Sequence, residues 1–225
     1  MSPTDETPFD TTATTTNSAI TEATSSATRE DQPPQNNLTE TEPSALPLLP
    51  PRYVYYHGTP FLLDGPYVGP DEKAPPFQAT TWHDDNIHDV TSDDIFSDAT
   101  PCILTTMHSV DTRLAISHAI LLENAVDQLP SDNFAIYLIT TDLPFTQNRF
   151  AREARLNFTT LLSDYTTRSF GKNYGVLVLP HLVLTRSVYV VDQHGFITHR
   201  ELVEEINSHL NYTAAADALY NAITS

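Results

Sequence analysis

Residues 101–141, with the sequence PCILTTMHSVDTRLAISHAILLENAVDQLPSDNFAIYLITT, decide the fold class of this chain. The continuous apolar character of 101–106 predicts a buried strand, and 134–141 predicts a second one. Between the two strands, apolar residues recur at intervals of four and three, which places them on one face of a helix: Ala115, Ala119, Leu122, Val126 and Leu129. A strand, a helix and a strand in this order favour an α/β fold.

Strands and helices continue on both sides of this unit. Residues 53–63, with Gly58-Thr59-Pro60 at the turn, predict a β-hairpin. Residues 65–100 are acidic and rich in loop-forming residues, with only weak strand signals. Asp142 is predicted to cap a helix whose first turn contains Pro144. The remaining predicted elements are a strand at 158–163, a helix at 168–174, a hairpin of 187–192 and 196–200 turned by Gln193-His194-Gly195, and a helix at 212–223.

This order of elements predicts a three-layer α/β sandwich around a mixed β-sheet, because strands and helices alternate and an antiparallel hairpin comes near the end. The thioredoxin-like fold has the same order. Residues 1–51 differ in composition: they are rich in Thr, Ser and Pro, acidic, and without an apolar period. They predict a disordered tail that ends in a stiff Pro-rich linker at 46–51. The folded domain is therefore expected at 52–225.

Composition excludes several classes of function. The net charge of −18 repels nucleic acid and anionic membrane surfaces. The single cysteine, Cys102, rules out an intramolecular disulfide. The acidic N-terminus is not that of a signal peptide, and no stretch has the roughly 20 apolar residues of a membrane span. A cytoplasmic protein without membrane or nucleic-acid partners is expected.

The segment after the second strand carries a specific resemblance. TDLPFTQNRF, at 141–150, resembles the ADLPFAQ-RF signature of bacterial thiol peroxidases, the atypical two-cysteine branch of the peroxiredoxins. SVDT, at 109–112, is similar to the P-S-x-D-T-x-x-C active-site loop of that family. Further similarity lies at 173–176, 186–192 and 201–206 and in the hairpin around 58–60, so that the resemblance covers about residues 52–222.

The resemblance implies a thioredoxin-like fold and reduction of hydroperoxides. In the family, a peroxidatic cysteine at a helix N-terminus attacks the peroxide as a thiolate and becomes a sulfenic acid. A resolving cysteine then forms a disulfide, which thioredoxin reduces. Thr112 matches the family threonine whose hydroxyl holds the peroxide. Arg186 matches the arginine that stabilises the thiolate and the transition state.

Three positions depart from the family pattern. Ala115 stands where the peroxidatic cysteine is expected, and Ala151 stands where the resolving cysteine is expected. His108 replaces the proline that shields the thiolate. A methyl group has no lone pair, so Ala115 cannot attack a peroxide. Thr112 and Arg186 could still bind a peroxide or a small oxyanion without turning it over.

Each candidate residue also has a purely structural interpretation. Cys102 lies in a strand predicted to be buried, where a free cysteine behaves as an inert small hydrophobe; the alternative is a residual nucleophile. Arg186 either forms a salt bridge to a carboxylate or retains an anion pocket. Thr112 either caps the helix, alone or with Asp111, or keeps its role toward peroxide.

The histidines raise a metal hypothesis. Residues 82–89, WHDDNIHD, are the densest cluster of possible ligands, and His108 with His118 is a second pair. Neither has the ligand spacing of known zinc motifs, and a solvated polar loop is the expectation for 82–89. No metal and no cofactor is therefore predicted.

The sequence predicts a member of the thiol peroxidase family that has lost its catalytic centre and acts by binding. The expected partners are a second copy in a homodimer, thioredoxin, or a catalytically intact relative. The main alternative is a redox enzyme that uses Cys102. A His/Asp metal-binding protein is the third possibility.

Overall fold

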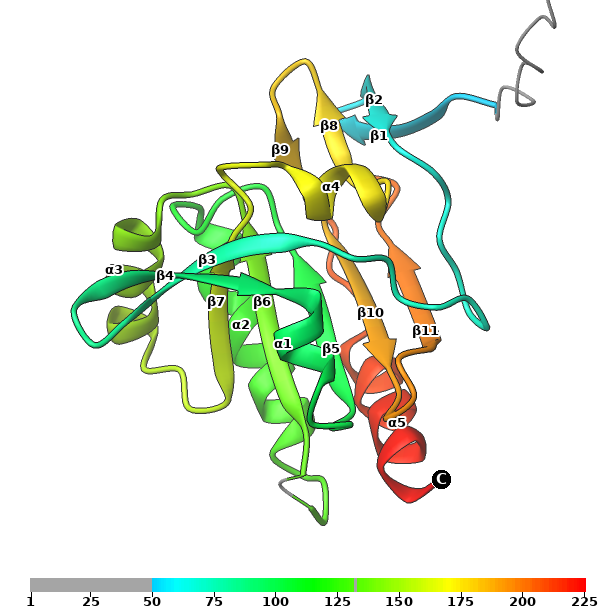
Figure 1. Cartoon of the computed structure of the whole chain (residues 1–225). Coiled ribbons are helices and arrows are strands. Elements are labelled where there is room, and N and C mark those ends of the chain that lie inside the picture. Colours follow the sequence, from blue (N-terminus) through cyan, green and yellow to red (C-terminus); the bar gives the residue numbers. More distant parts are fainter. Residues whose placement is uncertain (1–49, 132) are drawn as a thin grey trace, which may run out of the picture. The chain divides into compact units, whose positions relative to one another are not determined.

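The computed structural model describes residues 50–131 and 133–225. The predicted disordered tail at 1–51 lies outside the described residues, except for Pro50 and Pro51. The centre of the domain is a seven-stranded sheet (Figure 1). Its strands are, in spatial order, β11 (Ile197–Leu202), β10 (Ser187–Val191), β5 (Cys102–Thr106), β6 (Ala135–Thr140), β7 (Thr159–Ser163), β3 (Gln78–His83) and β4 (Asn86–Thr91).

The sheet is mixed, as the sequence predicts. β5, β6 and β7 run parallel to one another, and β10, β11, β3 and β4 are joined to them by antiparallel pairing. Every residue of β5 and β10 is buried, because these two strands are covered on both faces. The turn between β10 and β11 is held by Asp192, whose carboxylate accepts the N–H groups of His194 at 2.9 Å and Phe196 at 2.8 Å.

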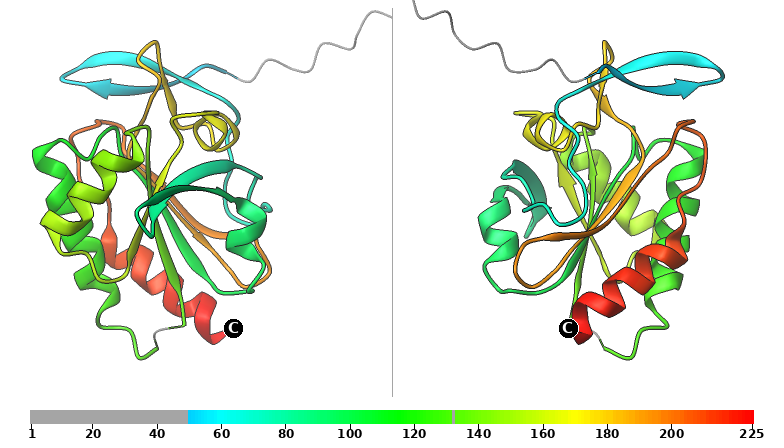
Figure 2. Two further views of the ribbon diagram at one scale, coloured as in Figure 1. Left: turned by 60° about the vertical axis from the view of Figure 1, so that its left-hand side comes forward. Right: turned by 90° about the vertical axis from the view of Figure 1, so that its right-hand side faces the viewer.

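Helices cover both faces of the sheet, which confirms the predicted three layers. α2 (Arg113–Val126), α3 (Pro144–Ala154) and α5 (Tyr212–Thr224) lie on one side (Figure 2). The short helices α1 (Ser92–Phe96) and α4 (Ser169–Asn173) lie on the other. The α2 residues predicted to face the core are buried there, with the exception of Leu129, which lies beyond the end of the helix: Ala115, Ala119, Leu122 and Val126.

The predicted N-terminal hairpin is confirmed and belongs to a second, smaller sheet. β1 (Arg52–Tyr56) and β2 (Thr59–Asp64) form the hairpin, and β8 (Leu177–Leu179) and β9 (Val183–Leu184) extend the sheet. β8 and β9 are absent from the sequence prediction, because strands of two or three residues are too short to show alternation.

The prediction of a loop for much of 65–100 is wrong. This region contains the antiparallel pair β3 and β4, followed by α1. Polar residues occupy both faces of the pair, so the usual alternation of apolar and polar residues is missing. The hairpin turn consists of Asp84 and Asp85, with φ angles of 47° and 56°, and aspartate tolerates this left-handed conformation better than most residues. Trp82 holds the hairpin against α3 by packing on Phe145, with 5.1 Å between ring centroids.

Two buried carboxylates fix the two ends of β7. Glu123 of α2 accepts the backbone N–H groups of residues 157–159, at 2.9–3.0 Å, and so positions the start of β7. Asp164, at the end of β7, is completely buried and accepts the N–H groups of Phe170 and Gly171 at the start of α4. Burial raises the pKa of Asp164 to about 6, although these hydrogen bonds and the nearby Arg168 and Lys172 oppose the shift.

Candidate functional site

The loop between β5 and α2 is organised by Asp142. Its Oδ1 accepts a hydrogen bond from the hydroxyl of Ser109 at 2.8 Å. Its Oδ2 accepts from the backbone N–H of Val110 at 2.7 Å and from the hydroxyl of Thr140 at 2.8 Å. The prediction that Asp142 caps α3 is therefore wrong: Leu143 occupies the N-cap position, Pro144 begins the helix, and the carboxylate of Asp142 binds the loop instead.

Thr112 occupies the N-cap position of α2, but its side chain does not cap the helix. Its hydroxyl donates to the carbonyl of Ser109 at 3.1 Å. Asp111 does not share the cap either, because its Oδ1 pairs with Nη2 of Arg149 from α3 at 2.6 Å. The prediction that Thr112 caps the helix is thus confirmed for its backbone position. It is wrong for its side chain, which makes no capping hydrogen bond to α2.

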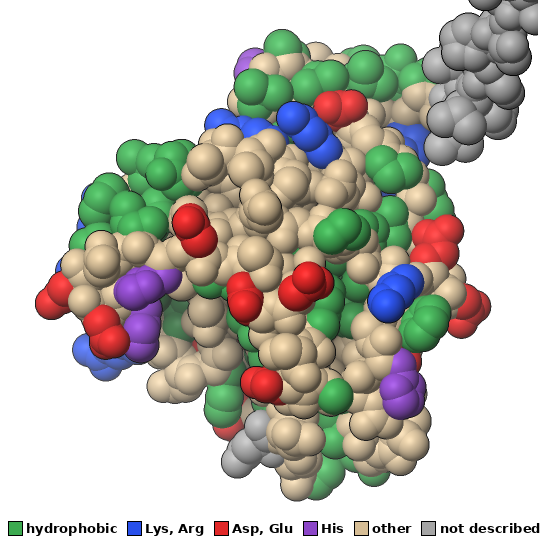
Figure 3. Space-filling model, in the orientation of Figure 1, with side chains coloured by type: hydrophobic (Ala, Val, Ile, Leu, Met, Phe, Trp, Pro, Cys, Tyr) green, Lys and Arg blue, Asp and Glu red, His purple; other side chains and the backbone are tan. Residues whose placement is uncertain are grey.

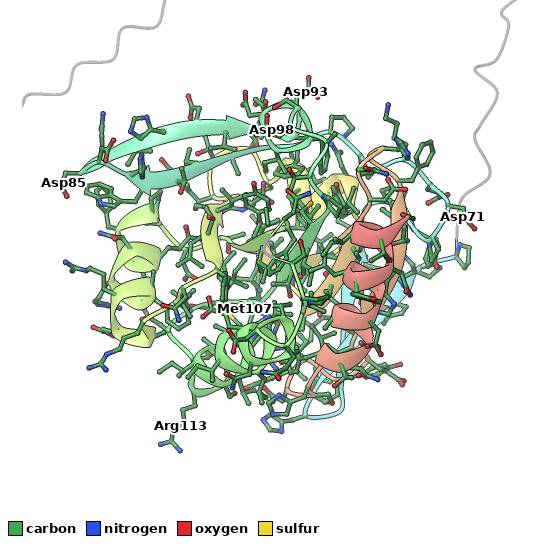
Figure 4. All side chains as sticks on the ribbon, turned by 90° about the horizontal axis from the view of Figure 1, so that it is seen from below. Asp71, Asp85, Asp93, Asp98, Met107 and Arg113 are labelled. Carbon is green, nitrogen blue, oxygen red and sulfur yellow. The ribbon has the colours of Figure 1, made fainter. Side chains whose placement is uncertain are left out.

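Positions 115 and 151 contribute to one apolar cluster. Ala115, in the first turn of α2, is completely buried, and Ala151 on α3 is partly buried against the same group. The other buried members come from the strands, the loop and both helices: Met107, Val110, Ala119, Leu138, Phe150 and Leu161. Figure 4 shows Met107 inside the molecule near α2, whereas Arg113, in the first turn of α2, points away from it. Both alanines therefore pack in the same apolar cluster between α2 and α3.

Arg186 reaches the same turn of α2 from the sheet. It directly precedes β10 and is completely buried. Its Nη2 donates to the carbonyl of Leu114, the neighbour of Ala115, at 3.1 Å, and its Nη1 donates to the carbonyl of Ser208 at 3.0 Å. Burial lowers the pKa of Arg186, which remains a cation at neutral pH.

The salt bridge considered for Arg186 is not found among the described residues, where its acceptors are backbone carbonyls. Nε of Arg186 is buried and has no hydrogen-bond partner in the described part of the chain. The guanidinium therefore lies beside position 115, and no described residue supplies it with a counter-ion.

His108 lies next to this cation at the end of β5. Its side chain is half-buried, and its Nδ1 has no partner among the described residues. Burial lowers the pKa of His108, the positive charge of Arg186 lowers it further, and Asp142 opposes the shift. The imidazole is therefore neutral at neutral pH and adds no positive charge to the site.

His118 is a buried member of this region whose contacts were not predicted. It is completely buried on α2, with Nε2 at 3.0 Å from the hydroxyl of Thr105 and Nδ1 at 3.1 Å from the hydroxyl of Tyr212. Thr105 donates its own proton to the carbonyl of Ser187, so Nε2 of His118 must be the donor and Nδ1 the acceptor. Its position on the apolar stripe, three residues after Ala115, is the sequence signal that points to burial.

Burial lowers the pKa of His118 to about 3, and the charge of Arg186 and His209 add to the shift. Both ring nitrogens are engaged in hydrogen bonds, so the ring offers no free lone pair to a metal ion. In the described ranges, no group of three or more His, Cys, Asp or Glu side chains is arranged to hold a metal ion.

Cys102 lies at the opposite end of β5 from this site. Five residues of extended chain, roughly 16 Å, separate it from Met107. The side chain is 1 % exposed and belongs to the core cluster that contains Tyr174 and Tyr189. Burial raises the pKa of the thiol to about 12, so it is protonated at neutral pH. The predicted burial of Cys102 is confirmed.

Comparisons with known proteins agree with this architecture. Residues 70–200 match the model of the AhpC/TSA family. The thiol peroxidase of Listeria innocua is 31 % identical over 169 residues, which cover 75 % of this chain and 98 % of the relative. The thiol peroxidase of Streptococcus agalactiae (strain NEM316) is 32 % identical over 116 residues, covering 52 % of this chain and 70 % of the relative. No helix in the described part of the chain is long and apolar enough to cross a bilayer.

Solved structures share the fold. A peroxiredoxin-like protein from Aquifex aeolicus superposes with a TM-score of 0.64 at 24 % identity, covering 76 % of this chain and 97 % of the other. The thiol peroxidase from Chromobacterium violaceum gives a TM-score of 0.63 at 24 % identity, with the same coverage. The family match and the relatives together identify this chain as a member of the AhpC/TSA family, in its bacterial thiol peroxidase branch.

Proposed function

We propose that this chain is a non-catalytic member of the thiol peroxidase family that acts by binding a partner in the cytoplasm. The observation that carries the proposal is the pair Ala115 and Ala151. These residues lie in one apolar cluster at the turn of α2 that Arg186 and Thr112 border. Peroxide reduction by this family needs a thiolate at that turn, and a methyl group supplies neither a nucleophile nor a redox-active atom.

Cys102 does not replace the missing nucleophile in this proposal. A thiol must ionise to attack a peroxide, and burial raises the pKa of Cys102 to about 12. Burial is the only influence on this pKa, and no cation among the described residues offsets it, whereas position 115 lies beside Arg186. The competing proposal of a redox enzyme that uses Cys102 therefore requires the core around it to open first.

A turnover assay tests the proposal. Wild type and the Cys102→Ser variant should both consume hydrogen peroxide at the background rate in the presence of thioredoxin, its reductase and NADPH. The physical reason is that neither protein has an accessible thiolate. Thioredoxin-dependent turnover by wild type that Cys102→Ser abolishes would contradict the proposal, and an intact bacterial thiol peroxidase serves as the positive control.

The proposed partner is a second copy of the chain, which packs through the face around the active-site loop. The side chains of Ile116 on α2 and Leu143 at the start of α3 are each about half exposed. Ile116 follows, in sequence, the loop between β5 and α2, and Leu143 directly follows Asp142, which holds this loop by hydrogen bonds. An interface at this face would remove both apolar side chains from water. A catalytically intact relative with the same fold could occupy the same face.

The Ile116→Glu variant should shift the chain from dimer to monomer, because a charge would be buried without a partner in the interface. Sedimentation equilibrium measures the dissociation constant, which we expect to rise at least about 100-fold, the equivalent of roughly 3 kcal/mol. Tyr220→Glu on α5, where the side chain is 42 % exposed, is the matched control and should remain dimeric. A wild type that is monomeric at high concentration, or an Ile116→Glu variant as dimeric as wild type, would refute this interface.

A further inference from the structure

We propose that His83 and His88, at the tip of the hairpin formed by β3 and β4, form an open binding site for a divalent transition-metal ion of the Cu²⁺ or Zn²⁺ class. The site lies outside the active-site loop and is independent of the proposed function. The two imidazoles are five residues apart in sequence, and the pairing of β3 with β4 brings them together.

The register of the hairpin places both histidines on one face. Thr81 lies opposite His88, and His83 lies opposite Asn86. Residues directly opposite one another in an antiparallel pair, and residues two apart along a strand, project from the same face. His83 and His88 are therefore diagonal neighbours, and their ring centroids are 6.2 Å apart. Trp82 and Ile87 form the next pair and project from the opposite face.

This separation is within reach of a shared metal ion. A metal–imidazole bond is about 2.0–2.1 Å long, and each nitrogen lies roughly 1.1 Å from its ring centroid, so two imidazoles on one ion have centroids at most about 6.4 Å apart. A tetrahedral arrangement brings the centroids to about 5.2 Å. The rings need to approach by only about 1 Å, which rotation of two exposed side chains provides.

One hydrogen bond and one ion-pair contact engage Nε2 of both rings. Nε2 of His88 is 3.1 Å from the carbonyl of His83, which can only accept, so Nε2 carries the proton. Nε2 of His83 is 3.3 Å from the carboxylate of Asp84, which is likewise an acceptor. Each ring thus presents the Nδ1 lone pair as its free ligand. A metal-bound imidazole whose second nitrogen donates to a carbonyl or carboxylate is the usual arrangement in metalloproteins.

The charge around the tip favours a cation. Asp84, Asp85 and Asp89 are exposed on the same hairpin, and the whole chain has a net charge of −18. Figure 3 shows histidine and acidic side chains gathered over this end of the molecule, and Figure 4 shows Asp85 at the very end of the hairpin. Two imidazoles are fewer ligands than the four of a structural zinc site, so water completes the coordination. Nitrogen ligands select the late transition metals over Mg²⁺ and Ca²⁺.

Trp82, the only tryptophan of the chain, is a built-in reporter. Bound Cu²⁺ quenches tryptophan emission at short range, and Trp82 is the direct neighbour of His83. Titration of the full-length protein with Cu²⁺ at pH 7.5 should quench Trp82 to saturation at one equivalent, whereas Mg²⁺ should neither quench nor compete. Paramagnetic resonance of the complex should show two nitrogen ligands.

Single variants separate this site from non-specific binding. His83→Asn and His88→Asn should each raise the Cu²⁺ concentration at half-quenching at least about tenfold, because one imidazole loses the advantage of chelation. His181→Asn, which removes an exposed histidine on another segment, should leave the midpoint unchanged. Two results would overturn the proposal. One is a wild type whose Trp82 emission is not quenched by an excess of Cu²⁺, and the other is a double variant His83→Asn/His88→Asn with the same Cu²⁺ concentration at half-quenching as wild type. Both positions are exposed, and circular dichroism confirms that the variants are folded.

Discussion

A cysteine introduced at position 115 should react with hydrogen peroxide at least about 100-fold faster than Cys102 does in wild type. The variant is Ala115→Cys in a Cys102→Ser background, so that it contains one thiol. The new sulfur would lie in the first turn of α2, beside the guanidinium of Arg186, which binds the carbonyl of Leu114. The helix N-terminus and the cation both stabilise a thiolate, and the same cation stabilises negative charge on the departing oxygen.

Ala119→Cys in the same background is the matched control. Ala119 is buried in the same apolar cluster as Ala115 but lies one turn further along α2, away from the helix N-terminus. Burial without a stabilising charge should keep this thiol protonated and unreactive. Equal rates for the two variants would mean that the pocket has lost its chemistry together with its cysteine. A sulfur in place of a hydrogen in this core costs about 1–3 kcal/mol, so thermal melts are needed to show that both variants fold.

A second cysteine at position 151 should turn this single reaction into a catalytic cycle. Ala115→Cys alone should not cycle, because its sulfenic acid has no partner thiol and can only be oxidised further by peroxide. Ala115→Cys/Ala151→Cys should form an intramolecular disulfide and regain thioredoxin-dependent turnover. A requirement for His108→Pro in addition would locate the remaining defect in the loop that Asp142 holds.

The second large effect concerns His118 and the pH dependence of stability. The folded-state pKa of His118 is about 3, compared with 6.5 for an unperturbed histidine. The unfolded chain therefore binds a proton that the folded chain does not, and the stabilisation that is present above pH 6.5 is lost as the pH falls toward 3. From pH 7 to pH 5 this loss amounts to about 2 kcal/mol.

The variant His118→Gln separates this contribution from other titrations. It should be less stable than wild type by about 1–3 kcal/mol at pH 7, because the contacts with Thr105 and Tyr212 are disturbed. At pH 5 the gap should narrow by about 2 kcal/mol, since glutamine does not titrate. Urea denaturation at the two pH values measures the difference, and the exposed His194→Gln is the control.

The comparison with a variant is necessary because the titration of Asp164 changes the stability in the opposite direction as the pH falls. Its folded-state pKa of about 6 lies above the usual 3.8, so its protonated form stabilises the fold below pH 3.8, and this stabilisation is lost as the pH rises through 6. From pH 7 to pH 5 it adds about 1 kcal/mol of stability. Wild type alone will therefore show a small net change. A gap between His118→Gln and wild type that stays constant over this range would contradict the assigned burial of His118.

Elements with a strong apolar period could be predicted from the sequence. The strands around 101–106 and 134–141 are continuous apolar runs, and the intervening helix has one apolar face. The structure confirms these elements and the hairpin turned at Gly195. The hairpin of β3 and β4 could not be predicted from periodicity, since Thr, His and Asp occupy both of its faces. It is held by contacts with distant residues, such as Trp82 on Phe145.

The roles of polar residues were predictable only where their partners are near in sequence. Asp142 stands where a helix cap is expected, yet its carboxylate binds Val110, which is 32 residues away. Arg186 finds its acceptors 22 and 72 residues away, at Ser208 and Leu114. The sequence itself shows that positions 115 and 151 are alanines. Their membership of one apolar cluster could not be predicted, because it depends on the packing of α2 against α3.

Whether the chain has lost peroxide chemistry can be measured by trapping sulfenic acid with dimedone in the presence of hydrogen peroxide, followed by intact mass spectrometry. Dimedone reacts with sulfenic acid and not with oxidised methionine, so Met107 does not interfere. We expect no adduct on folded wild type, and one adduct on the Ala115→Cys variant that lacks Cys102. An adduct on Cys102 of folded wild type, formed as fast as the adduct on the variant, would show that this chain retains a reactive thiol and is not a non-catalytic family member.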